Sequence, residues 1–158
     1  MKKTKNSASI YAKIGIIWLV FISAYCSMEP RSYPITIYNK TDHYINILLS
    51  HGDPSYPDTL LPDRYYDINM PVKSGNGRHY APTLTYKNFV QQWGSDTVII
   101  FIFHSDTLTK YTWKEVREGY KILKRYDVSW QEMEALKGEI NYPPTEAEKG
   151  IRQYPPYE

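Results

Sequence analysis

Thr97-Val-Ile-Ile-Phe-Ile-Phe103 is the longest apolar run of the chain outside its N-terminal 26 residues. All seven residues are β-branched or aromatic, and polar or turn residues lie on both sides. An unbroken apolar run of about seven residues predicts a strand that is buried on both faces. It is too short for a membrane-spanning helix, which needs about 20 apolar residues. We therefore expect the hydrophobic core to form around this strand.

Two helices are predicted after this strand by their N-terminal signals. Thr112-Trp-Lys-Glu115 and Ser129-Trp-Gln-Glu132 both have the spacing of a capping box. The first helix is expected to end before Gly119 and the second before Gly138. Between them, Tyr120–Tyr126 alternates in polarity and predicts a surface strand with one partly buried face.

Short strands are predicted in the first half of the chain and at the end of the domain. Pro34–Asn39 and His43–Ser50 alternate around a three-residue polar break, which is typical of a β-hairpin. Tyr65–Met70 predicts a third strand, Thr85–Trp93 a short helix, and residues 139–142 a last strand.

Together these elements predict one α+β domain at residues 33–142. Its first half is mainly β, a hairpin and meander, and its second half runs strand-helix-strand-helix-strand. We expect a single sheet, mixed or antiparallel. Residues 143–158 are rich in proline and poor in aliphatic residues, so they predict a disordered tail.

The N-terminus has the pattern of an export signal. Residues 1–13 carry lysines, and Ile14–Ala24 is an apolar run of eleven residues. The single cysteine, Cys26, follows directly and resembles the cysteine of bacterial lipoprotein signals, which takes up diacylglycerol and becomes the first residue of the mature chain. Residues 27–32 would then be a tether. Tyr25 stands where such signals have a small residue, so the alternatives are cleavage without lipidation, an unmodified cysteine or a retained membrane anchor.

The formal charge of +2 comes from this leader. Residues 1–26 carry four lysines and no acid, which leaves 15 basic and 17 acidic residues in the remainder. The body therefore lacks the basic footprint of a nucleic-acid-binding protein, and we expect no nucleic-acid partner.

No catalytic, metal or cofactor motif is found. The four histidines lack the i, i+4 spacing of a zinc protease, Gly-x-Ser-x-Gly is missing, and Ser74–Gly77 lacks the lysine of a phosphate loop. His51-Gly-Asp53 and His104-Ser-Asp106 are expected to be turns in which aspartate binds backbone. Carboxylates can also meet in space, and one loop-rich region holds a cluster of them: Asp58, Asp63 and Asp67.

Aromatic residues are abundant, with 16 tyrosines. They suit half-buried sheets, so packing is the ordinary role. The alternative is a sugar- or peptide-binding face, for which the candidates are Tyr56, Tyr65, Tyr66 and Trp93.

Several segments resemble a group of small lipoproteins of gut Bacteroides and relatives that has no assigned activity. They are Asp96–Leu108, Tyr111–Arg117, Tyr120–Asp127, Tyr56-Pro-Asp-Thr59 and Asn141-Tyr-Pro-Pro144. The resemblance implies an envelope location, held at the outer membrane or facing the periplasm through a lipid such as palmitate, and no mechanism.

These observations favour an exported, lipid-anchored envelope protein that binds or assembles with an envelope protein or glycan, without a cofactor. The alternative is a hydrolase acting on glycan or peptide, in which carboxylates or the pair His51 and His104 meet in a cleft.

Overall fold

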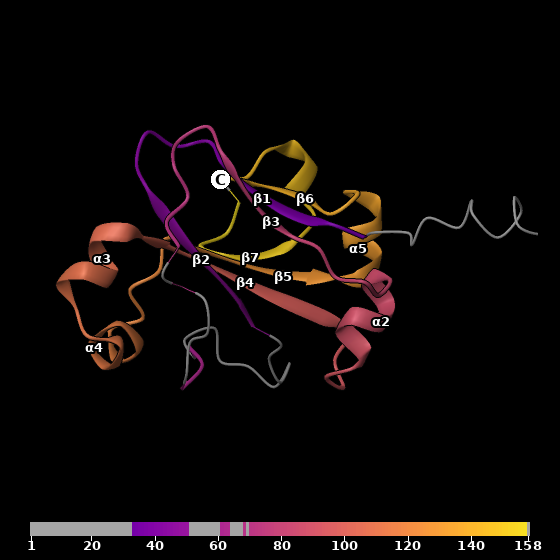
Figure 1. Ribbon diagram of the computed structural model, residues 1–158, viewed down its shortest axis with the longest axis horizontal. Coiled ribbons are helices and arrows are strands. Elements are labelled where there is room, and N and C mark those ends of the chain that lie inside the picture. Colours follow the sequence, from indigo (N-terminus) through magenta and orange to yellow (C-terminus); the bar gives the residue numbers. More distant parts are fainter. Residues whose placement is uncertain (1–32, 51–60, 64–67, 69, 158) are drawn as a thin grey trace, which may run out of the picture. The chain divides into compact units, whose positions relative to one another are not determined.

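The computed structural model describes residues 33–50, 61–63, 68 and 70–157, which belong to a compact unit spanning Ser32–Glu158. Its fold is α+β and mainly β, as expected, and the described strands form two sheets (Figure 1). The first sheet has the order β3-β1-β6, formed by Gly77–Tyr80, Ile35–Asn39 and Glu139–Tyr142. The second has the order β2-β4-β5-β7, formed by Ile45–Ser50, Thr97–His104, Lys124–Ser129 and Arg152–Tyr154.

The central strand is confirmed as β4, which pairs antiparallel with β2 and β5 and is buried on both faces. Alternate residues point to opposite faces of a strand. Val98, Ile100 and Ile102 therefore belong to one hydrophobic cluster, and Ile99 and Phe101 to another. Each fully buried side chain of this size contributes roughly 1.5–3 kcal/mol to folding.

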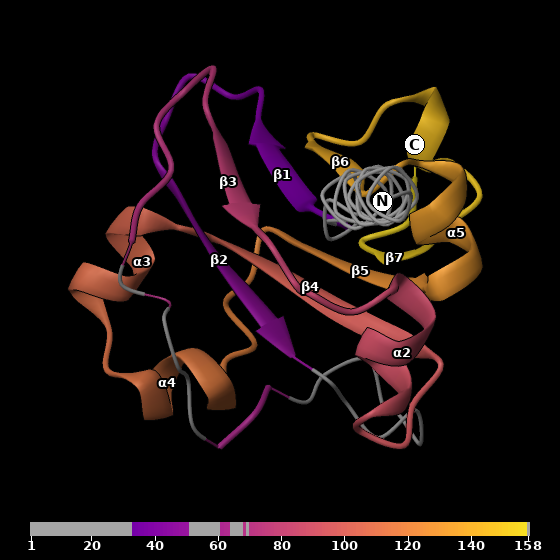
Figure 2. The ribbon, with the colours of Figure 1, turned by 45° about the vertical axis from the view of Figure 1, so that its right-hand side comes forward.

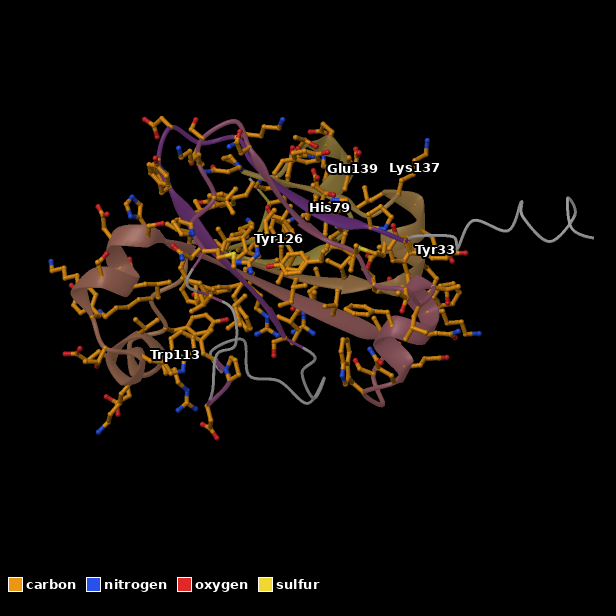
Figure 3. All side chains as sticks on the ribbon, in the orientation of Figure 1. Tyr33, His79, Trp113, Tyr126, Lys137 and Glu139 are labelled. Carbon is orange, nitrogen blue, oxygen red and sulfur yellow. The ribbon has the colours of Figure 1, made fainter. Side chains whose placement is uncertain are left out.

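The larger cluster lies between the two sheets. Ile35 and Ile37 of β1 and Ile140 of β6 meet the inner residues of β4 there, with Tyr126 of β5 fully buried among them. Figure 3 shows the labelled Tyr126 in the middle of the domain. An isolated antiparallel bridge, Ile45–Val72, links the chain before β3 to β2 in the other sheet.

The helices lie at opposite ends of the strands (Figure 2). At one end α2 (Tyr86–Gln91) contacts α5 (Trp130–Ala135). At the other end α3 (Ser105–Lys110) and α4 (Trp113–Glu118) adjoin the smaller cluster.

The capping boxes predicted at the starts of the two helices are confirmed. Thr112 and Ser129 both form complete capping boxes, and Gly119 is the C-cap of α4. The chain leaves α5 through two left-handed residues, Lys137 at φ 53° and Gly138 at φ 75°.

The expectation of one sheet with a β1–β2 hairpin is wrong, because these strands belong to different sheets. The buried Asn39 side chain explains the separation. Its Oδ1 accepts from the backbone and hydroxyl of Thr41, and its Nδ2 donates to the carbonyls of His43 and Val72. These bonds turn the chain from one sheet to the other instead of folding it back beside β1.

Two further elements differ from the sequence prediction. The strand expected at Tyr120–Tyr126 lies later, in β5, which pairs with β4 and β7 and is buried on both faces. Tyr126 and Val128 belong to the larger cluster, and the buried Arg125 and Asp127 pair with each other. Residues 105–110 form α3, which no pattern predicted. The third strand expected at Tyr65–Met70 falls mostly outside the described residues.

The expectation of a disordered tail after residue 142 is also wrong. Residues 146–148 form a 3-10 turn, and β7 adds a fourth strand to the second sheet by pairing with β5. Ile151 is buried in the core between the sheets. The ordered domain therefore continues through Tyr157.

Candidate ligand-binding pocket

A pocket of about 350 Å³ lies where the start of β5, the end of β6 and the C-terminal segment meet. This volume is at the lower end of the range of small-ligand sites. Most of its walls are rings, two phenols and four pyrrolidines, and the complete lining is Leu123, Lys124, Tyr142, Pro143, Pro144, Pro155, Pro156 and Tyr157.

One wall of the pocket is fixed by a fully buried carboxylate, that of Glu148. Its Oε1 accepts from the backbone N and side-chain Nδ2 of Asn141, both at 2.8 Å. Its Oε2 accepts from the backbone N of Thr145 at 2.8 Å and from the Thr145 hydroxyl. The four bonds tie together the two sides of the loop that carries Pro143 and Pro144.

The electrostatics of Glu148 agree with this geometry. Burial raises the pKa of the carboxyl, but the hydrogen bonds from Thr145 and Asn141 outweigh burial and hold the pKa below its ordinary value. The group is therefore a carboxylate at neutral pH, and each of its bonds is charge-assisted.

The opposite wall is the segment after β7. The buried Lys124 donates from Nζ to the carbonyls of Pro155 and Pro156. The Tyr157 hydroxyl donates to Glu146 Oε1 at 2.9 Å, and the Lys149 ammonium lies 5.7 Å from the centre of the Tyr157 ring. The peptide bonds before Pro143 and Pro155 are both cis.

Tyr142 lines the pocket with a hydroxyl that can still hydrogen-bond. Burial raises the pKa of its phenol, and within the described part of the chain its hydroxyl has no hydrogen-bond partner. A half-buried phenol in this state can both donate to and accept from a ligand. The neighbouring prolines offer apolar ring faces and no backbone N–H.

Of the binding residues predicted from the sequence, Trp93 alone is among the described residues, and it does not line this pocket. Tyr56, Tyr65 and Tyr66 lie outside the described residues, as does the lipidation candidate Cys26. Trp93 is described and 39 % exposed, and it packs edge-on against Phe89 with ring centroids 4.6 Å apart at the end of α2.

The histidines and aspartates considered for hydrolysis, where the structure describes them, take part in a helix cap, a stacked ring pair and an ion pair. His104 caps α3, and its Nδ1 accepts from the backbone N of Asp106 at 3.1 Å. Its ring stacks on His43 with centroids 4.5 Å apart. Asp63 is exposed and pairs with Arg117. His51, Asp58 and Asp67 lie outside the described residues.

Within the described ranges, no group of three or more histidine, cysteine, aspartate or glutamate side chains is arranged to hold a metal ion. The same part of the chain contains no helix with the length and apolarity to cross a membrane.

Sequence reasoning missed the pocket because it treated the C-terminal prolines as a tail. A signal was present in the tripeptide Tyr-Pro-Pro, which occurs at both 142–144 and 154–156. The two copies supply five of the eight lining residues.

Comparison of the chain with family models, with curated proteins and with solved structures finds no match.

Proposed function

We propose that the protein is an exported, lipid-anchored module of the cell envelope that binds a glycan in the pocket lined by the two Tyr-Pro-Pro segments. The observation that carries the proposal is the pocket itself, whose lining combines ring faces with Tyr142, a phenol whose hydroxyl has no hydrogen-bond partner within the described residues. A sugar ring has C–H faces that pack on aromatic and proline rings, and it has hydroxyls that exchange hydrogen bonds with a phenol.

Support for the location comes from the sequence alone. A lysine-bearing segment, an apolar run of eleven residues and Cys26 occur in the order expected of a lipoprotein signal. The test is metabolic labelling with a clickable fatty acid in cells that express the wild type or Cys26→Ala. We expect label on the wild type and none on the variant. An unlabelled wild type would exclude the lipid anchor.

The binding site is tested by saturation-transfer NMR with soluble oligosaccharides released from bacterial peptidoglycan and a panel of neutral disaccharides. We expect transfer to at least one sugar in the wild type and its loss in Tyr142→Ser. Tyr44→Ser is the matched control, because Tyr44 is 48 % exposed and does not line the pocket. Equal signals in both variants would exclude the pocket.

The same spectra distinguish the other ligand classes. New reducing-end signals that grow with time would favour a hydrolase over a binding module. No transfer to any sugar would contradict the glycan proposal and leave an envelope protein as the expected partner.

A further inference from the structure

Strand β3 is an edge strand, and it takes no part in the pocket. It pairs with β1 on one side and, within the described residues, with no strand on the other (Figure 2). The opposite edge of the same sheet differs, because the backbone N–H of Asn141 in β6 donates to the buried carboxylate of Glu148. The β3 edge has no such cover in the part of the chain that the structure describes.

The register of β3 against β1 identifies the backbone groups that point outward. Thr36 lies opposite His79, and the Thr36 N–H donates away from β3, to the carbonyl of Gly138 at 2.8 Å. Opposed residues in an antiparallel ladder alternate between hydrogen-bonded and non-hydrogen-bonded pairs. Thr36 and His79 therefore form a non-hydrogen-bonded pair, and the N–H and C=O of His79 point away from β1. Among the described residues neither group has a hydrogen-bond partner, and His79 is exposed.

This edge has few of the features that keep edge strands from pairing. Proline and lysine are common protections of an edge, and Gly77–Tyr80 contains neither and keeps an unbroken register with β1. Its one charged side chain, Arg78, lies 5.0 Å from the centre of the Tyr80 ring and donates to the carbonyl of Met70 at 3.4 Å. The segment at Met70, whose side chain is 63 % exposed, therefore lies beside the edge.

The sequence of β3 is complementary to its own reversed copy. In an antiparallel pair centred on His79, the His79 residues of the two copies exchange both of their outward N–H···O=C bonds. Arg78 of each copy then lies opposite Tyr80 of the other, at the distance over which cross-strand side chains interact. These two side chains already form a cation–π contact within one chain. Each guanidinium would thus face an aromatic ring and no like charge, which favours a second copy over an unrelated strand.

We propose that two copies of the protein associate by antiparallel pairing of their β3 edges, so that two three-stranded sheets become one continuous sheet. The contact is isologous, with the two-fold axis passing between the two His79 residues. Because the paired edge is only four residues long, the interface is smaller than that of a stable complex, and the association is weak. It depends on neither the pocket nor the lipid anchor.

The test is disulfide cross-linking of the full chain at the centre of the paired edge. Opposed residues in a hydrogen-bonded antiparallel pair have Cα atoms about 5.5 Å apart, which a disulfide can bridge. His79→Cys is made together with Cys26→Ser, so that the new thiol is the only one in the chain. Lys114→Cys in the same background is the matched control on α4, where the lysine side chain is 81 % exposed.

After mild oxidation we expect a species of twice the chain mass from His79→Cys, several-fold more abundant than from Lys114→Cys. A second measurement is the co-purification of two differently tagged copies of the full chain. His79→Pro removes the outward N–H, which β1 does not use, and an edge strand tolerates proline at such a position. We expect His79→Pro to abolish co-purification several-fold more completely than His79→Thr, which keeps the N–H. Circular dichroism checks that both variants are folded.

The outcomes that contradict the pairing are distinct. Equal cross-linking at positions 79 and 114, or none at either, would overturn it. Co-purification that folded His79→Pro leaves unchanged would overturn it as well. A cross-linked species with the mass of a different protein would show that the edge accepts another chain, and it would exclude the second copy as the occupant.

Discussion

Glu148→Gln is the substitution that most directly tests the architecture of the pocket. The glutamine has nearly the same shape as Glu148, but one carboxylate oxygen becomes an NH₂ group that faces two donors. Two of the four hydrogen bonds from Asn141 and Thr145 are therefore lost. A hydrogen bond to a charged group contributes about 1.5–3 kcal/mol, and rotation of the Thr145 hydroxyl can recover part of one. We expect a net loss of about 3 kcal/mol.

The assay is thermal unfolding at pH 7 followed by circular dichroism. For a domain of this size, about 3 kcal/mol corresponds to a fall in Tm on the order of 10 °C. Glu146→Gln is the control, because Glu146 lies on the same turn, its side chain is 79 % exposed, and its contacts with Lys149 at 3.5 Å and with the Tyr157 hydroxyl at 2.9 Å are both exposed. A surface pair of this kind contributes less than about 1 kcal/mol.

The pH dependence gives a second check of the same reasoning. The pKa of Glu148 is lower in the folded protein than its ordinary value, so its contribution to stability is complete above the unfolded pKa, about 4.3. That contribution disappears as the pH falls through the folded pKa. The wild type and Glu148→Gln should therefore converge in stability in acid. A variant within about 0.5 kcal/mol of the wild type at pH 7 would refute the assigned role of the carboxylate.

Two further substitutions test the ends of α5. Gly138→Ala should destabilise the domain by more than about 2 kcal/mol in urea unfolding, because Gly138 has φ 75° and a Cβ there would collide with the Pro34 carbonyl and the Tyr86 hydroxyl. Gly75→Ala is the control, because Gly75 also has a positive φ of 74° but has open space around it. This substitution should cost only about 1 kcal/mol. Equal losses of stability in the two variants would contradict the collision at Gly138. Ser129→Ala removes the capping hydroxyl of α5 and should cost about 1 kcal/mol. Ser129→Thr keeps a capping hydroxyl and should cost less, and equal losses would contradict the capping role.

The elements that the sequence predicted correctly are those that short local patterns determine. The β4 strand followed from an uninterrupted apolar run, and the starts of α4 and α5 followed from serine or threonine three residues before glutamate. Each of these signals is complete within a few residues, so no tertiary contact was needed to interpret it.

The sheet arrangement depended on contacts between distant residues. Alternation in β1 and β2 is equally consistent with a hairpin, and only the buried Asn39 bond to Val72 shows why the chain changes sheets. The C-terminal segment looked like a tail because it has few aliphatic residues, but Ile151 and Glu148 are buried and β7 pairs with β5. The pocket could not be predicted while its second wall was assigned to a disordered region.

Strand β1 runs parallel to β6, with Asn39 opposite Tyr142. The chain therefore enters the domain at the start of β1, and the pocket lies at the opposite end of these two strands, beside Tyr142. Thirteen residue steps at about 3.4 Å each separate Cys26 from Asn39, and the neighbouring strand lies about 5 Å farther, so the pocket stays within about 50 Å of Cys26. For a protein held at Cys26, a glycan fixed to the same membrane would meet the pocket at an effective concentration on the order of millimolar. A weak Kd for soluble fragments would then be compatible with nearly full occupancy at the membrane surface.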